Sequence, residues 1–230
     1  MTKQLSYKDI SYSLKKSNRK TISIFIERDG SVSILAPAPY QLEKIEQVIE
    51  AKRSWIYRNL AEWEDLNRTQ LQREFVNGEG FVYLGRSYRL SLEEKQDTDL
   101  LLKRGRFLLR RDKIHKGADI FKAFYKQKGL KKISERIALY APKIGVKVKN
   151  VKVLELQNRW GSCSENGNLN FHWKCLMAPV SVLDYIVVHE LVHLLHRNHD
   201  NNFWNTVDKV MPNYAKHVKW LKHNGVDMSL

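Results

Sequence analysis

The sequence has few cysteines, few acidic residues for its number of basic ones, and no long apolar segment. Its 230 residues include two cysteines, Cys163 and Cys175. Two thiols without a CxxC pair exclude both a disulfide-stapled secreted scaffold and a four-cysteine zinc site, so we expect them to be reduced. The apolar runs, such as residues 186–188, are far shorter than the roughly 20 residues that cross a bilayer. We therefore expect no transmembrane helix and no membrane partner.

The start of the chain also lacks the features of a secretory signal. Residues 1–8 are mostly polar, with lysine at positions 3 and 8, where a signal peptide has an apolar core and a small-residue cleavage site. Hydrophobic residues make up 43% of the sequence and charged residues 28%, which is typical of globular proteins. We expect a cytoplasmic protein with folded domains.

The positive charge is concentrated in the middle of the sequence. The formal net charge is +15, and residues 103–152 alone have 17 Lys and Arg against three acidic residues, an excess of 14. Such a segment attracts phosphates, and DNA is one partner that it allows. A solvated lysine face on an amphipathic helix explains the same pattern. The charge pattern leaves both explanations open.

The first half of the chain shows the alternation of β-strands. Residues 22–36 predict a hairpin with a turn at Asp29-Gly30, and residues 83–88 predict a second hairpin. Between them, apolar residues recur at helical spacing over residues 40–65. We expect residues 1–117 to form an antiparallel, β-rich domain on which this helix packs.

The second half of the chain alternates between helical and extended patterns. A helix is predicted after Gly117, strands over residues 146–156 and around 169–171, and a helix after Pro179 with Ser181 as its N-cap. A last helix is predicted over residues 201–222, with an interruption at 211–213. We expect residues 118–230 to form a second domain, which makes the whole chain α+β.

The helix after Pro179 contains the motif H-E-x-x-H, with His189, Glu190 and His193. Four residues advance a helix by about 400°, so both imidazoles lie on one face and are placed to bind the same zinc ion. Glu190 then acts as a general base that takes a proton from the water attacking a carbonyl. This pattern is typical of peptidases.

A catalytic zinc site usually takes a third protein ligand. His199 follows a predicted helix end at Arg197-Asn198, where a left-handed Asn198 would let the chain turn back to the metal. His196 shares the helical face but lies about 10 Å along the axis from His189, too far for one ion. The spacing favours His199, with His196 and Asp208 as alternatives.

The order of motifs resembles the YgjP-like metallopeptidase family. The matching segments are R-W-G-S-C-S at 159–164, N-L-N at 168–170, residues 184–194 with H-E-L-V-H, Asn198-His199, Phe203-Trp204 and Met211-Pro212, with weaker matches in the first 60 residues. The resemblance implies a zincin-like second domain related to SprT-like proteases. It also implies zinc bound by His189, His193 and His199, with Glu190 as the base and Arg159 and Trp160 lining the site.

Three functions follow from these observations. The first is a zinc-dependent peptidase that acts on proteins or peptides. The second is a hydrolase with the same site and a non-peptide substrate. The third is a nucleic-acid-associated protein whose segment 103–152 binds DNA, with the zinc site regulatory or directed at DNA-bound proteins. A purely structural zinc site is disfavoured, because it has no need of Glu190.

Overall fold

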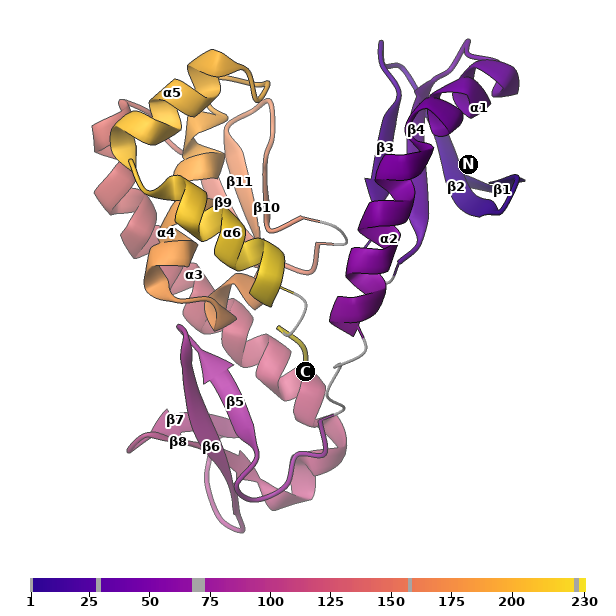
Figure 1. Ribbon diagram of the computed structural model, residues 1–230. Coiled ribbons are helices and arrows are strands. Elements are labelled where there is room, and N and C mark those ends of the chain that lie inside the picture. Colours follow the sequence, from indigo (N-terminus) through magenta and orange to yellow (C-terminus); the bar gives the residue numbers. More distant parts are fainter. Residues whose placement is uncertain (1, 28–29, 68–72, 157–158, 226–227) are drawn as a thin grey trace. The chain divides into compact units, whose positions relative to one another are not determined.

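The computed structural model describes all residues except 1, 28–29, 68–72, 157–158 and 226–227, and for residues 62–67 it describes the backbone alone. The chain forms two compact units, Met1–Gln70 and Leu71–Leu230. The described residues combine helices with three small sheets (Figure 1). This confirms the predicted α+β class.

The first unit is a four-stranded sheet with two helices on one face. Its elements are β1 (Thr2–Tyr7), β2 (Ile10–Ser17), β3 (Ser23–Ile26), β4 (Val32–Pro37), α1 (Leu42–Ala51) and α2 (Arg53–Asn67). The strand order is β1-β2-β4-β3. Alternate residues of β2 and β4, among them Tyr12 and Ile34, are buried together with Ile45, Ile49 and Ile56 of the helices.

Two local predictions in this unit need correction and one is confirmed. β3 and β4 form the predicted antiparallel hairpin, although Asp29 of its turn lies outside the described residues. The single helix over 40–65 is two helices that meet at Lys52. The sheet is mixed rather than antiparallel, because β4 also pairs in parallel with β2. Alternation within a strand does not tell which neighbour that strand takes, so the sequence pattern could not show this.

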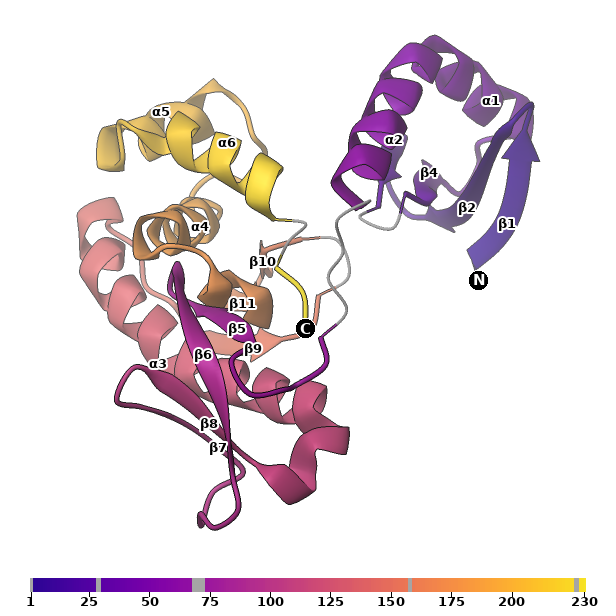
Figure 2. The same cartoon turned by 60° about the horizontal axis from the view of Figure 1, so that its bottom comes forward.

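The second unit contains a long central helix with a sheet packed on one part of it and the remaining elements on the other (Figures 1 and 2). Its elements are β5 (Gly80–Tyr83), β6 (Arg86–Glu93), β7 (Leu100–Lys103), β8 (Arg106–Arg110), the 3₁₀ helix η1 (Arg111–Lys116), α3 (Gly117–Ile144), β9 (Asn150–Leu154), β10 (Gly161–Cys163), β11 (Asn168–His172), the 3₁₀ helix η2 (Trp173–Met177), α4 (Val180–Val192), α5 (Asn201–Val210) and α6 (Tyr214–Asn224). The strand orders are β5-β6-β8-β7 and β10-β11-β9. In the first of these sheets β6 and β8 are parallel, so it too is mixed.

Aromatic contacts join the β5–β8 sheet to α3 in one core. Phe121 of α3 stacks on Phe81 with ring centroids 4.2 Å apart and meets Phe107 at 5.0 Å. The unit therefore begins at residue 71, and the boundary expected near residue 117 falls inside this shared core. The sequence shows that these strands need a partner for their apolar face, but only the fold shows that this partner is α3.

α4 lies at the centre of the second unit and is held by an ion pair to α3. Asp184 accepts hydrogen bonds from Arg136 Nε and Nη2 at 2.5 and 2.8 Å and from the Tyr140 hydroxyl at 3.1 Å. The helix begins at Val180 after Pro179, with no side-chain cap, so Ser181 is not its N-cap. Ten of its 13 residues are buried. None of the described helices has the length and apolar character that spanning a membrane requires.

Candidate metal centre

Three histidine side chains meet at the end of α4. His189 lies in its last turn, and His193 is the residue that caps it. Their rings lie 4.9 Å apart, as the spacing of four residues on a helix predicts. His199 comes from the segment after the helix, and its Nε2 lies 3.0 Å from Nε2 of His189. One nitrogen from each of the three rings lies within 4.8 Å of the other two.

The chain returns to His189 by a tightened turn at the end of α4. The N–H of Leu194 donates to the carbonyl of Leu191, and that of Leu195 donates to Val192, both at 3.0 Å. These i to i+3 bonds end the helix in the manner of a 3₁₀ turn. Asn198 is not among the described residues with positive φ, so the left-handed conformation predicted for it is wrong. Asp200 then begins α5 by accepting a hydrogen bond from the Phe203 N–H at 3.0 Å.

The imidazoles of His189 and His193 are oriented by hydrogen bonds to their Nδ1 atoms. His193 Nδ1 lies 3.0 Å from the carbonyl oxygen of His196, so it carries the proton and donates it. His189 Nδ1 lies 3.4 Å from the Tyr185 hydroxyl. Such partners on the far nitrogen fix the tautomer and the ring orientation of metal-binding histidines. The Nε2 lone pair of His193 therefore remains available on the other side.

The two alternative third ligands lie elsewhere. The His196 ring turns to α5, where its Nε2 lies 3.1 Å from Thr206 Oγ1. Asp208 is exposed on α5. Neither residue belongs to the group that could hold a metal ion.

The arrangement fits a tetrahedral metal ion. Histidine nitrogens at 2.0–2.1 Å from a zinc ion stand roughly 3.3 Å from one another, and the separations in the group bracket this value. Burial, and then the neighbouring His193 and His199, lower the pKa of His189 to about 3. Burial also lowers the pKa values of His193 and His199. All three rings are therefore neutral at pH 7, which is the state that binds metals.

Glu190 is a buried carboxyl group without a hydrogen-bond partner among the residues that the structure describes. Its side chain is 5% exposed, and its Oε2 accepts no hydrogen bond from any described residue. Burial raises its pKa to about 8, although nearby Arg159 opposes the rise. An unpaired buried carboxyl group costs stability. Such a cost is typical of groups kept for chemistry rather than for folding.

Gly161 of β10 provides the space that Glu190 occupies. A Cβ atom at position 161 would lie 2.6 Å from Cγ and from Oε1 of Glu190. This distance is shorter than van der Waals contact, so any larger residue displaces the carboxyl group. The glycine of the R-W-G-S motif thus sets the position of Glu190.

On the expectation that Glu190 is the base of a peptidase, as the resemblance implies, Gly161→Ala should lower peptide hydrolysis by about 100-fold, because a displacement of roughly 1 Å of a catalytic group costs that much. Bound metal should remain near the wild-type content, since the histidines are untouched. Gly129→Ala is the matched control, because its Cβ would lie 2.7 Å from Leu176, a close contact that involves neither Glu190 nor the histidines. Activity on labelled casein, metal content and melting temperature are measured for both variants. Equal losses of activity in the two would show a general packing effect and contradict the role of Gly161.

Aromatic side chains surround the three histidines. The sequence analysis did not predict these contacts. Phe203 contacts the rings of His189 and His193 at 4.9 and 4.6 Å, and Trp204 stacks on His199 at 5.7 Å. Tyr185 lies four residues before His189 on the same face of α4, so helical spacing could have identified it. Phe203 and Trp204 belong to a segment that matches the family, but helical spacing could not place them at the histidines, because α5 is a separate helix.

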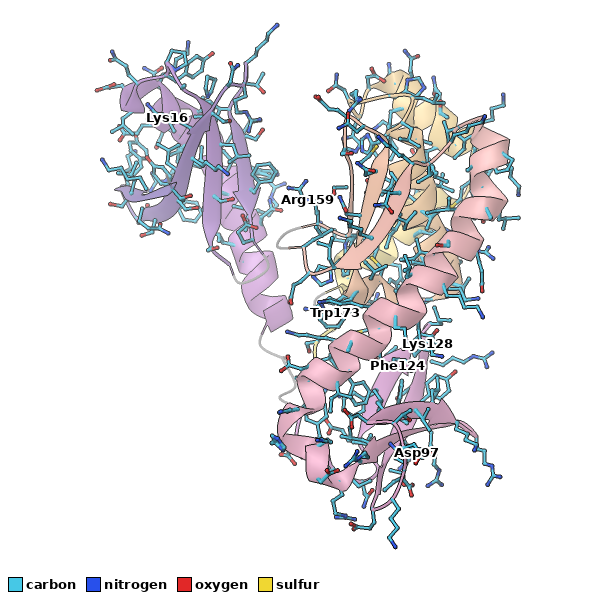
Figure 3. The ribbon with its side chains drawn as sticks, turned by 180° about the vertical axis from the view of Figure 1, so that it is seen from behind. Lys16, Asp97, Phe124, Lys128, Arg159 and Trp173 are labelled. Atoms are coloured by element: carbon cyan, nitrogen blue, oxygen red, sulfur yellow. The ribbon has the colours of Figure 1, made fainter. Side chains whose placement is uncertain are left out.

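The two residues expected to line the site take different positions. Arg159 is exposed just before β10 (Figure 3), and its charge acts on Glu190. The Trp160 indole packs instead at Gly225, where a Cβ would lie 2.6 Å from Cζ2, and its ring lies 6.4 Å from that of His172. Trp160 thus contacts the C-terminal end of α6. Arg159 is the residue of the two whose charge affects the Glu190 carboxyl group.

Comparison with known proteins gives a family match and a distant likeness to solved structures. The model of the family described as "YgjP-like, metallopeptidase domain" matches residues 20–224. Among solved structures, the metallopeptidase zymogen abylysin of Pyrococcus abyssi is 21% identical, with a TM-score of 0.37, over 39% of this chain and 90% of that chain. No curated protein gives a significant match.

Proposed function

Because the chain belongs to the YgjP-like metallopeptidase family, we propose that it is a zinc-dependent peptidase in which His189, His193 and His199 bind the ion and Glu190 is the general base. One observation supports this assignment most strongly. Three neutral histidine nitrogens converge beside a buried carboxyl group that has no partner among the described residues. Proteins or peptides are the substrates that the family implies.

The choice of zinc rests on the chemistry of the ligands. Three imidazoles and an open fourth position are typical of catalytic zinc, whereas magnesium and calcium take oxygen ligands. A zinc ion held there polarises the scissile carbonyl and makes water more acidic. The histidines are held for this purpose by the His196 carbonyl and the Tyr185 hydroxyl.

Glu190 moves the proton in the proposed reaction. Its carboxylate takes a proton from the attacking water and later gives that proton to the nitrogen of the leaving amine. Burial raises the pKa of Glu190 to about 8, so the ionised form that accepts the proton is a stronger base than an ordinary glutamate and is increasingly populated as the pH rises towards 8. The contact with Gly161 keeps the carboxyl group in place through both transfers.

We expect chelation to abolish the activity and zinc to restore it. The full-length protein is treated with 1,10-phenanthroline, dialysed, and assayed on fluorescein-labelled casein with added Zn²⁺, Mg²⁺ or Ca²⁺. Recovery with Zn²⁺ and none with Mg²⁺ or Ca²⁺ is the expected result, because imidazole nitrogens bind the latter ions poorly. Full activity in the stripped protein would contradict the proposal.

Nucleic acid binding by residues 103–152 is the second candidate, supported by the charge excess of that segment. Within the second unit, several of its cations are paired. Examples are Arg110 with Asp112 at 2.7 Å, Lys122 with Glu155 at 3.6 Å, Lys132 with Glu135 at 2.7 Å and Arg136 with Asp184 at 2.5 Å. The segment also extends over β8, α3 and β9 rather than along one element. Its excess charge is therefore divided among several surfaces.

A further inference from the structure

The outer face of the β5–β8 sheet carries three cations side by side, here called the cation row. Arg106 of β8 pairs in register with Arg89 of β6 on one side and with Lys103 of β7 on the other. Leu90 and Phe107, the next residues in sequence, are buried on the face that packs on α3. Because side chains alternate along a strand, the cation row faces solvent, and all three of its residues are exposed.

Within the part of the chain that the structure describes, no acidic side chain neutralises the cation row. None of its three side chains forms an ion pair with any residue that the structure describes. At the other end of β8, Arg110 pairs with Asp99 at 3.6 Å and with Asp112 at 2.7 Å. Like charges placed opposite each other on neighbouring strands destabilise a sheet. The fold thus keeps three like charges side by side, and a bound anion would reduce the repulsion between them.

We propose that the cation row binds the sugar-phosphate backbone of double-stranded nucleic acid without reading its sequence. Neighbouring strands lie about 4.8 Å apart, so the row is roughly 10 Å long. Successive phosphates of one duplex strand rise about 3.4 Å along its axis, and the long, exposed side chains of the row allow each of its three cations to contact one phosphate. Arginine also binds phosphate through two parallel hydrogen bonds. Arg104, exposed in the β7–β8 turn, adds a fourth cation beside Lys103.

The neighbouring side chains favour a duplex over other anionic partners. The other outer positions of the central strands hold Ser87, Ser91, Glu93, Leu108 and Arg110, so this face has no aromatic side chain on which unpaired bases would stack. An acidic protein needs aromatic or apolar anchors at its interface. On these four strands the exposed large apolar side chain is Leu101 alone. The cations of this face are therefore better suited to phosphate groups than to unpaired bases or to a protein surface.

The experiment compares two variants with equal loss of charge. The first, Arg89→Gln/Lys103→Gln/Arg106→Gln, removes the cation row. The control, Lys128→Gln/Lys131→Gln/Lys147→Gln, removes three exposed cations on and after α3 (Lys128 is labelled in Figure 3). Binding of the full-length proteins to a short fluorescein-labelled DNA duplex of random sequence is measured by anisotropy over a range of NaCl concentrations.

We expect the wild type to bind with a steep salt dependence and the row variant to bind at least about 10-fold more weakly at low salt. The slope of log K against log salt should become shallower by about 2.7 for three lost phosphate contacts. The control should keep most of the wild-type slope. The melting temperature of the row variant should be equal or higher, because the repulsion between strands is removed. This checks that the variant is folded.

Four outcomes would overturn the proposal. The wild type fails to bind the duplex at low salt, or both variants lose affinity equally, which indicates diffuse net charge. Single-stranded DNA binds more tightly than the duplex, which indicates base contacts. Poly-glutamate competes as well as duplex DNA at equal charge, which indicates an acidic protein partner. Since no residue of the row lies in the proposed zinc site, casein hydrolysis should be unchanged in the row variant.

Discussion

Replacing Glu190 by glutamine is expected to lower peptide hydrolysis by about 10²- to 10⁴-fold, the range by which a general base contributes. Glutamine keeps the size of the side chain, so the contact with Gly161 is retained. It does not accept the proton of the attacking water, however, and has none to give to the leaving amine. The three histidines are unchanged, and zinc should stay bound.

The measurement pairs turnover of labelled casein with zinc content by elemental mass spectrometry. Asp208→Asn is the matched control, because this exposed residue of α5 loses its charge in the same way without lying in the histidine group. It should retain both activity and zinc. Unchanged turnover in Glu190→Gln would remove the proposed base. Loss of zinc together with turnover would instead make Glu190 part of the metal site.

Replacing His199 by alanine is expected to reduce bound zinc from about one ion per chain to near zero after dialysis, because two histidines leave a catalytic site one ligand short. Activity should fall to background with it. The His196→Ala variant should keep its zinc, although the substitution removes the contact between the His196 ring and Thr206. The two variants are well matched, because each replaces a histidine and the two positions are three residues apart in the sequence.

Zinc content, activity and melting temperature are measured for both variants. The ring of His196 lies between α5 and the turn after α4, so His196→Ala should lower the melting temperature slightly while the backbone carbonyl that orients His193 remains. Loss of zinc in His196→Ala with retention in His199→Ala would reverse the ligand assignment. Retention in both would mean that a residue outside the histidine group completes the site.

The local elements were predicted well where a short segment of sequence specifies them. The hairpins at β3–β4 and β5–β6, the start of α3 after Lys116 and the break between α5 and α6 agree with the sequence interpretation. Each depends on alternation, helical spacing or a turn residue that acts over a few positions. The cap of α4 was predicted wrongly, because the helix begins at Val180, one residue before Ser181, and has no side-chain cap.

The sequence by itself determined that His189, Glu190 and His193 lie in one helix with both imidazoles on the same face, because helical geometry places residues four apart on one side. It also determined the excess of positive charge. The tertiary structure decided what lies around them: Gly161 against Glu190, Phe203 against both imidazoles, and His199 rather than His196 beside His189. It also brought Arg89, Lys103 and Arg106 from three strands into one row. These contacts join residues distant in sequence, and their formation depends on which surfaces pack together rather than on any local pattern.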